Sequence, residues 1–391
     1  MTSLPDRRSL RLLCRILSEN RETREKAIGE LPNDDAAASV VASAQLEKIL
    51  PAFYDAISGF PECLAKSERV SLAMSLEANR RRNRKIYDAV AEIAEAANRR
   101  SIAVAPLKGA RWIIEDGTGY AAWRSMIDVD LLVHVEHYGA AREVLEQLGY
   151  RAVRSERNIF GHMRFAGHYH HVALRRDEQP FVTEVHRHLQ WQPALLPTEE
   201  VFGRACSSSP GLWLPCPWHA AFHAIIHWQI HHYGYRFGFH RITDGLDIAR
   251  FLCRSDVDWD ALVNHARRVG VVNEVNVALA IVTELFGVPP PAQVQIPDDG
   301  RRQGAAALKI RESRLLGWQA KQLQRIDRLW HDHRFLYRAS LRNSGPAATH
   351  RGLWALRLRR LPFVISHLVS IGLVRLAALL QRPFHFSRDQ S

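Results

Sequence analysis

The segment that decides the fold is residues 104–133, which read VAPLKGARWIIEDGTGYAAWRSMIDVDLLV. An apolar run ends in Lys108-Gly109, a helical pattern follows, and a second apolar run opens with Asp128 and Asp130. Because residues alternate faces along a strand, the two carboxylates are expected on one side of it, about 7 Å apart. That arrangement, with a Lys-Gly turn upstream, suits a divalent metal that holds a phosphate chain.

The pattern around this segment predicts a small α/β domain with a mixed sheet. Strand and helix patterns alternate over 102–107, 109–116, 129–135, 137–148, 151–155, 170–175 and 181–186. The five residues 176–180, which end in Pro180, suit a hairpin turn between the last two strands. Residues 196–218 are rich in Pro, Ser and Gly, and this composition predicts a connecting loop.

Helical patterns predominate on both sides of this domain, so the chain is expected to be α+β. A long helix is expected over 67–99, and Pro51 is expected to kink or split an earlier helical stretch. We predict four regions: an N-terminal helical region (1–100), an α/β domain (101–195), a His-rich helical domain (196–290) and a C-terminal Arg-rich helical region (291–391).

Composition bounds the class of protein. The 391 residues are 47% hydrophobic and 24% charged, which is ordinary for a soluble globular protein. No secretory signal is evident, and no C-x-x-C pair occurs among the cysteines, which fits a reducing cytosol. The cysteines are Cys14, Cys63, Cys206, Cys216 and Cys253.

The formal net charge of +12 leaves two interpretations open. It arises either from ordinary solvated faces or from surfaces that attract nucleotides, nucleic acid or anionic lipid. The basic run 80–85 has the same two interpretations. The last apolar segment, 353–380, is interrupted by Arg and His, and its longest uncharged stretch is too short to span a bilayer. We expect a core or interface helix there, with peripheral contact to an anionic membrane as the alternative.

The triplet Asp128-Val129-Asp130 is by itself weak evidence for a metal site, and other residues strengthen that interpretation. Arg124 precedes the two aspartates, and a third acid, Glu184, lies in the strand-like run 181–186. An acid inside such a strand is costly unless it is partly exposed at the sheet end or bound to a cation.

Together these residues resemble the polymerase-beta-type nucleotidyltransferase superfamily, and more narrowly a bacterial branch labelled uncharacterised nucleotidyltransferase. The resemblance covers roughly residues 80–255. Its motifs here are Lys108-Gly109, Arg124, Asp128-Val129-Asp130, Glu184-Val185-His186, the spaced His223, His227 and His231, and Arg241-Ile242-Thr243-Asp244 with Asp247. It implies a polymerase-beta-like nucleotidyltransferase domain with a mixed sheet, flanked by N-terminal and C-terminal helical regions.

The resemblance also implies a two-metal mechanism. Asp128, Asp130 and Glu184 would hold two Mg²⁺ (or Mn²⁺) ions, and an NMP would pass from an NTP to a hydroxyl or phosphate acceptor. Lys108, Gly109 and Arg124 would contact the triphosphate, although many members of the superfamily have Gly-Ser where this chain has Lys-Gly. The implied contacts to substrate are His186, His223, His227, His231 and Arg241. The acceptor (small molecule, peptide or saccharide) and the base stay open.

Histidines recur every four residues at 219, 223, 227 and 231, and so line one face of a helix. A packed stripe facing the catalytic cleft, contact with nucleotide or acceptor, and a zinc site are the three interpretations. Of these, the packed stripe is favoured, because no acid or cysteine lies at a suitable spacing within the run.

Other chemistries fit the sequence poorly. There is no G-x-x-x-x-G-K-[ST] loop, no G-x-G-x-x-G after a strand and no G-x-S-x-G elbow. Two rivals to an enzyme stay open: a non-catalytic nucleotide-binding sensor or scaffold of the same fold, and a nucleic-acid-binding protein acting through Arg-rich helices.

Overall fold

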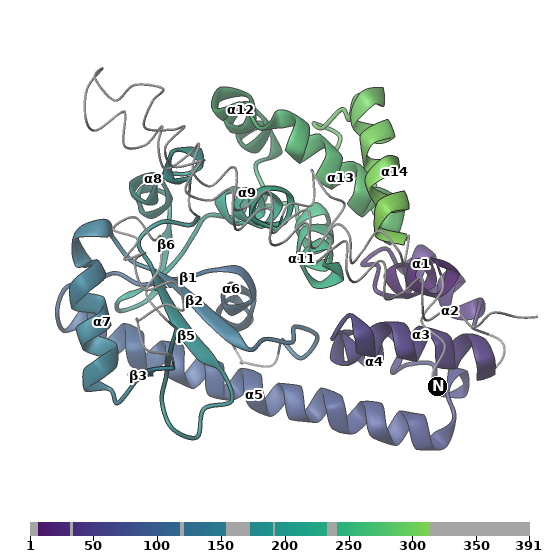
Figure 1. Ribbon diagram of the computed structural model, residues 1–391, viewed down its shortest axis with the longest axis horizontal. Helices are drawn as coiled ribbons and strands as arrows, with labels where there is room; N and C mark the ends of the chain where they lie inside the picture. Colours follow the sequence, from purple (N-terminus) through teal and green to yellow (C-terminus); the bar gives the residue numbers. More distant parts are fainter. Residues whose placement is uncertain are drawn as a thin grey trace, which may run out of the picture.

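The computed structural model describes residues 7–31, 34–117, 121–153, 173–190, 192–232 and 241–312. Within these ranges a five-stranded sheet lies on one side of the molecule and the first four helices lie on the other, with α5 (Lys66–Asn98) extending along both (Figure 1). The C-terminal Arg-rich region predicted from residue 291 lies outside the described residues beyond residue 312.

The sheet has the order β1-β2-β5-β4-β3. Its strands are β1 (Ala105–Pro106), β2 (Asp128–Leu132), β3 (Arg151–Ala152), β4 (Leu174–Arg175) and β5 (Val182–His186). β2 and β5 are parallel and the other pairs are antiparallel, so the predicted mixed sheet and the hairpin between β4 and β5 are confirmed. The parallel register places Asp130 directly beside Glu184.

Both faces of β2 are covered, because the strand carries apolar side chains on each face. Val129 and Leu131 belong to a buried cluster that includes Ile93 of α5 and Val144 of α7 (Tyr138–Gln147). Leu132 belongs to the larger cluster formed mainly by the helices. The sheet is therefore a layer between two cores, which fixes the position of the acidic residues on β2 and β5.

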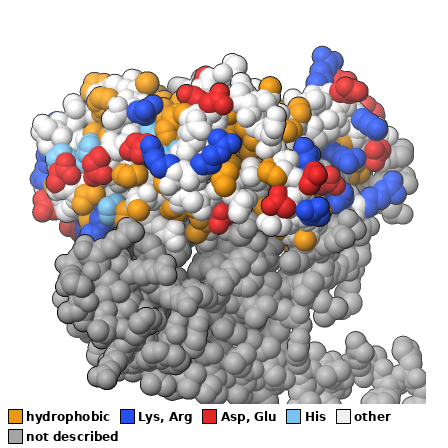
Figure 2. Space-filling model, turned by 90° about the horizontal axis from the view of Figure 1, so that it is seen from above, with side chains coloured by type: hydrophobic (Ala, Val, Ile, Leu, Met, Phe, Trp, Pro, Cys, Tyr) orange, Lys and Arg blue, Asp and Glu red, His pale blue; other side chains and the backbone are white. Residues whose placement is uncertain are grey.

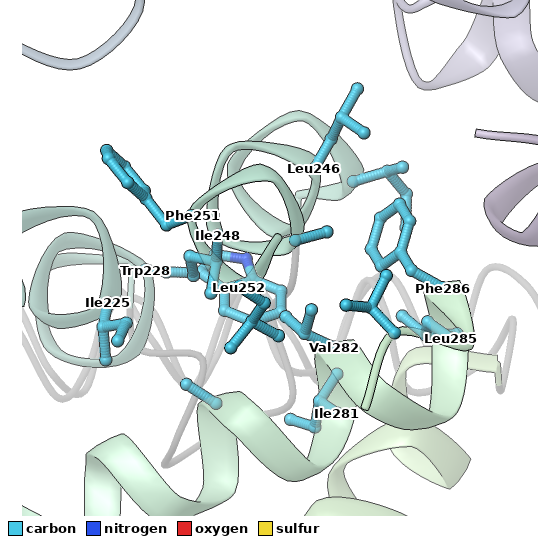
Figure 3. Close-up of a cluster of buried hydrophobic side chains, with 14 of the residues drawn as sticks. Ile225, Trp228, Leu246, Ile248, Phe251, Leu252, Ile281, Val282, Leu285 and Phe286 are labelled. Carbon is cyan, nitrogen blue, oxygen red and sulfur yellow. The ribbon is translucent and has the colours of Figure 1, made fainter. Parts of the chain in front are cut away.

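The larger core joins helices from distant parts of the chain. They are α1 (Arg7–Ile16), α2 (Arg21–Gly29), α3 (Asp34–Leu46), α4 (Leu50–Ile57), α9 (Pro217–Ile226), α11 (Ile242–Leu252), α12 (Trp259–Val269), α13 (Val272–Phe286) and α14 (Asp298–Glu312). A π-helical turn, η4 (His227–His231), extends α9. In this core Trp228 of η4 lies among side chains of α11 and α13, as Figure 3 shows.

Two expectations about element boundaries have different outcomes. The break near Pro51 is confirmed, because α3 ends at Leu46 and α4 begins at Leu50, with Pro51 in its first turn. The loop predicted over 196–218 is wrong. This stretch contains α8 (Thr198–Gly203) and a hairpin of β6 (Cys206–Ser209) and β7 (Leu212–Leu214).

The hairpin forms despite its Ser-rich composition because it packs against the rest of the domain. Val104 N donates to Gly211 O and Trp213 N donates to Val104 O, so the segment before β1 pairs with β7. Gly211 has φ +77° and lies on α5, where a Cβ atom would meet the carbonyl oxygen of Ala94. A turn of this kind requires glycine at that position.

We expect Gly211→Ala to lower the free energy of unfolding by about 2–4 kcal/mol, because it adds backbone strain and a collision with α5. Gly203→Ala is the matched control, since a Cβ atom there meets nothing within 4 Å. Urea unfolding of both variants measures the difference. Equal stability of the two variants would contradict the packing described here.

The basic run 80–85 lies on α5, where Arg81 pairs with Glu77 and Arg84 with Asp88. These i,i+4 pairs favour the solvated-face interpretation of the run. Acidic and basic side chains are also interspersed on the described part of the face that Figure 2 presents. None of the helices in the described ranges is long and apolar enough to cross a membrane.

Candidate active site

A cleft of about 470 Å³ lies where the central strands β2 and β5 meet the helices of the larger core. It brings together residues that are far apart in sequence, from β2, β5, the start of α6 (Lys108–Glu115), η4 and α11. The predicted site residues that line it are Lys108, Gly109, Arg124, Asp128, Asp130, Glu184, His186, His227, His231 and Arg241. His223 does not line this cleft but a small neighbouring cavity.

Asp130 is the buried centre of the acidic group. Its Oδ2 atom is 3.0 Å from Lys108 Nζ, and its Oδ1 atom accepts a hydrogen bond of 2.8 Å from His186 Nε2. Burial alone would raise the pKa of Asp130, but Lys108 and His186 outweigh burial and hold that pKa well below its usual range. Asp130 is therefore an anion held in one orientation. The His186 ring that donates to it is only 1% exposed, so the ring itself is fixed by the surrounding core.

Two more carboxylates complete the acidic group: Asp128 of β2 and Glu184 of β5. Asp128 is exposed at the start of β2, and Glu184 is half-buried beside Asp130. Burial, together with repulsion from Asp130, raises the pKa of Glu184 to about 7. One ligand atom from each of Asp130, Glu184 and His186 lies within 4.8 Å of the others, so this group could hold a divalent metal.

The raised pKa of Glu184 predicts a gain in stability when its charge is removed. The pKa of this carboxyl is about 7 in the folded protein, against 4.5 for an ordinary glutamate. Its ionisation therefore lowers the free energy of unfolding by an amount that grows as pH rises between those two values. We expect Glu184→Gln to raise the free energy of unfolding of the metal-free protein by about 1–3 kcal/mol at pH 8.

The gain should shrink at pH 5, where Glu184 is protonated in the folded protein and only partly ionised in the unfolded chain. Urea titrations in a chelator at both pH values measure it. A gain that is the same at pH 5 and pH 8 would show that repulsion among these carboxylates is not its source.

The Lys-Gly turn is held tightly against β2. Leu107 N donates to the carbonyl oxygen of Asp130, and Lys108 adopts a left-handed conformation with φ +50°. Such strain in a non-glycine residue concentrates at functional sites. A Cβ atom on Gly109 would collide with Met126 Sδ, so a larger residue here would displace the Met126 side chain.

Arg124 is largely buried and already has a partner. Its Nη2 atom is 2.9 Å from Asp247 Oδ2, which ties the segment before β2 to α11. Burial raises the pKa of Asp247 to about 6 even with Arg124 beside it. Two further residues, which the sequence pattern did not single out, hold this segment. They are Asn79 and Asn83 of α5, whose side-chain amides each donate to the carbonyl oxygen of Arg124. The sequence pattern that could have indicated them is the pair of asparagines four residues apart, on one face of a long predicted helix.

The histidine stripe divides between two environments. His219 packs beside Trp218, and His223 Nε2 donates to the carbonyl oxygen of Leu189. Burial lowers the pKa of each of these two imidazoles to about 3, so they are neutral packing groups at neutral pH. His227 and His231 instead reach the cleft, with their rings stacked. His232, which the four-residue spacing did not indicate, lies with its ring edge-on to His227.

The chain thus combines an α+β fold with a mixed sheet that presents clustered acids beside a Lys-Gly turn. The family model described as uncharacterised nucleotidyltransferase matches residues 34–287, which is more than half of the chain. The chain therefore belongs to the uncharacterised nucleotidyltransferase family, and it is an enzyme whose substrate is a nucleoside triphosphate. No curated protein and no solved structure matches it.

Proposed function

We propose that this enzyme transfers an NMP from an NTP to a hydroxyl or phosphate acceptor in the described cleft. Its fold would be of the polymerase-beta type, with Asp128, Asp130 and Glu184 as the ligands of two Mg²⁺ or Mn²⁺ ions. The observation that carries the proposal is the parallel register of β2 and β5. It places Asp130 beside Glu184, with the Lys108 ammonium 3.0 Å from Asp130.

The acidic group fits divalent cations. Carboxylate oxygens are the ligands that Mg²⁺ prefers, and Asp128, Asp130 and Glu184 all line the same cleft. Their mutual repulsion contributes to the raised pKa of Glu184, and a bound cation would relieve it. When bound, such ions neutralise charge on the triphosphate and lower the pKa of an acceptor hydroxyl.

The surrounding residues of the chain would bind and orient the triphosphate. Lys108, partly exposed in the cleft, would donate to a phosphate oxygen, and Arg241 would do so from the cleft wall. The buried His186 would keep Asp130 in position and would not itself touch substrate. Arg124 would act through Asp247, by fixing α11 against the segment that precedes β2.

In the reaction, an oxygen of the acceptor attacks the α-phosphorus of the NTP. A bond forms between that oxygen and the α-phosphorus, and the bond from the α-phosphorus to the oxygen that bridges it to the β-phosphorus breaks. Pyrophosphate leaves, and the proton of a hydroxyl acceptor passes to solvent. Most of the rate gain in such a site comes from positioning and from neutralising charge.

The test is to incubate the full chain and Mg²⁺ with each of the four α-labelled NTPs and a panel of alcohol, peptide and saccharide acceptors. We expect pyrophosphate release with matching transfer of label, and loss of both in a chelator. NTP binding measured by calorimetry, without release for any acceptor in the panel, would favour the sensor alternative. Salt-sensitive binding to random oligonucleotides without NTP turnover would favour the nucleic-acid alternative.

A further inference from the structure

A second group of metal-binding side chains lies in the same cleft, on its helical side. It consists of His227 of η4, His232 at the end of that turn, and Asp244 of α11. One ligand atom from each lies within 4.8 Å of the others, and His232 Nε2 is 3.7 Å from Asp244 Oδ2. All three residues line the cleft.

The π-helical turn is what brings the two histidines together. Residues five apart do not share a face of an α-helix, whereas an i→i+5 hydrogen bond places them side by side. Here His232 N donates to the carbonyl oxygen of His227 at 2.9 Å, and the two ring centroids are 4.3 Å apart. Trp228, fully buried in the core between α11 and α13, anchors the turn in this orientation (Figure 3).

Asp244 supplies an independent reason to expect a cation. Its side chain is buried, and its Oδ2 atom has no hydrogen-bond partner among the described residues, since 3.7 Å to His232 exceeds hydrogen-bond length. A buried carboxylate oxygen without a donor is costly unless it binds a metal.

We propose that His227, His232 and Asp244 bind a transition-metal cation, for which Zn²⁺ is the best match. Two imidazoles and one carboxylate suit Zn²⁺ and not Mg²⁺, which prefers oxygen ligands. Ligands about 2.1 Å from a tetrahedral Zn²⁺ stand about 3.4 Å apart, close to the observed separation of His232 from Asp244. The fourth position faces the cleft, where water or an oxygen of a bound molecule completes the coordination.

The site is separate from the proposed Mg²⁺ ligands and stands whether or not nucleotidyl transfer occurs there. The test therefore uses Zn²⁺ alone, added to the full chain after removal of metal with a chelator. We expect tight binding by calorimetry, a rise in the temperature of unfolding, and the visible absorption of a tetrahedral site when Co²⁺ replaces Zn²⁺. Asp244→Asn and His232→Gln should each weaken Zn²⁺ affinity by about 100-fold or more.

Two controls identify the site. Glu184→Gln removes a ligand from the other acidic group, and His188→Gln removes an imidazole outside the cleft; both should keep the tight binding of Zn²⁺. Urea unfolding in the chelator verifies that each variant is folded. If Asp244→Asn does not fold, His232→Gln is the deciding variant, because the His232 side chain is partly exposed. Absence of tight binding in the unaltered chain, or its loss in Glu184→Gln but not in His232→Gln, would overturn the proposal.

Discussion

Asp128→Asn should lower the rate of nucleotidyl transfer by about 10³-fold or more, because the metal ions that we propose Asp128 to bind would supply several kcal/mol of transition-state stabilisation. The same change should leave the free energy of unfolding within about 0.5 kcal/mol of its original value, since the side chain is exposed at the start of β2. Pyrophosphate release under saturating NTP and Mg²⁺ measures the first effect, and urea unfolding the second.

Asp177→Asn is the matched control for this prediction. Asp177 is also an exposed aspartate of the same domain, but it lies in the turn between β4 and β5 and does not line the cleft. Its replacement should leave the rate unchanged. A rate for Asp128→Asn within 10-fold of the original would remove Asp128 from the proposed metal ligands.

Arg124→Met should lower the free energy of unfolding by about 3–5 kcal/mol, because it leaves a buried carboxylate without its ionic partner. Asp247 is 4% exposed, and Arg124 is the group that lies 2.9 Å from it. The pKa of Asp247, already about 6, should rise further in this variant. The loss of stability should therefore be larger at pH 8 than at pH 5, where Asp247 is protonated, as urea unfolding at both pH values can measure.

The double variant Arg124→Met, Asp247→Leu separates the ion pair from packing. Replacing both charges with apolar side chains leaves no unpaired ion, so most of the lost stability should return. If the loss in free energy of unfolding of the double variant equalled the sum of the losses of the two single variants, the two side chains would stabilise the fold by packing and not by their charges. Its NTP turnover would then show whether the tie between α11 and the segment before β2 matters for the reaction.

The regular elements of the α/β domain could be predicted because hydrophobic periodicity determined them. The long helix expected over 67–99 is α5, Lys66–Asn98, and the strand carrying Asp128 and Asp130 is β2. The hairpin over 206–214 was missed because its strands have little alternation, and it is stabilised by contacts with Val104 and α5. Tertiary contacts override local composition in such segments.

The candidate site could be predicted in part, because residue type and spacing carry some of its chemistry. The acids and the Lys-Gly turn lie together in one cleft, as expected. Arg124 differs: its guanidinium is paired with Asp247, more than a hundred residues away, which no local pattern indicates. His232 was passed over because helical spacing predicts neighbours four residues apart, whereas the chain forms a π-helical turn there.

The sequence by itself determined the class of fold, the strand that carries Asp128 and Asp130, and the chemical character of the cleft. These follow from periods of two and 3.6 residues and from the chemistry of carboxylates, which are local properties of the chain. Only the tertiary structure decided which groups face one another: Asp130 with Lys108 and His186, and Asp244 with His232. Such pairings depend on strand register, on a single π-helical hydrogen bond and on core packing, which arise only when distant segments bury their apolar faces together.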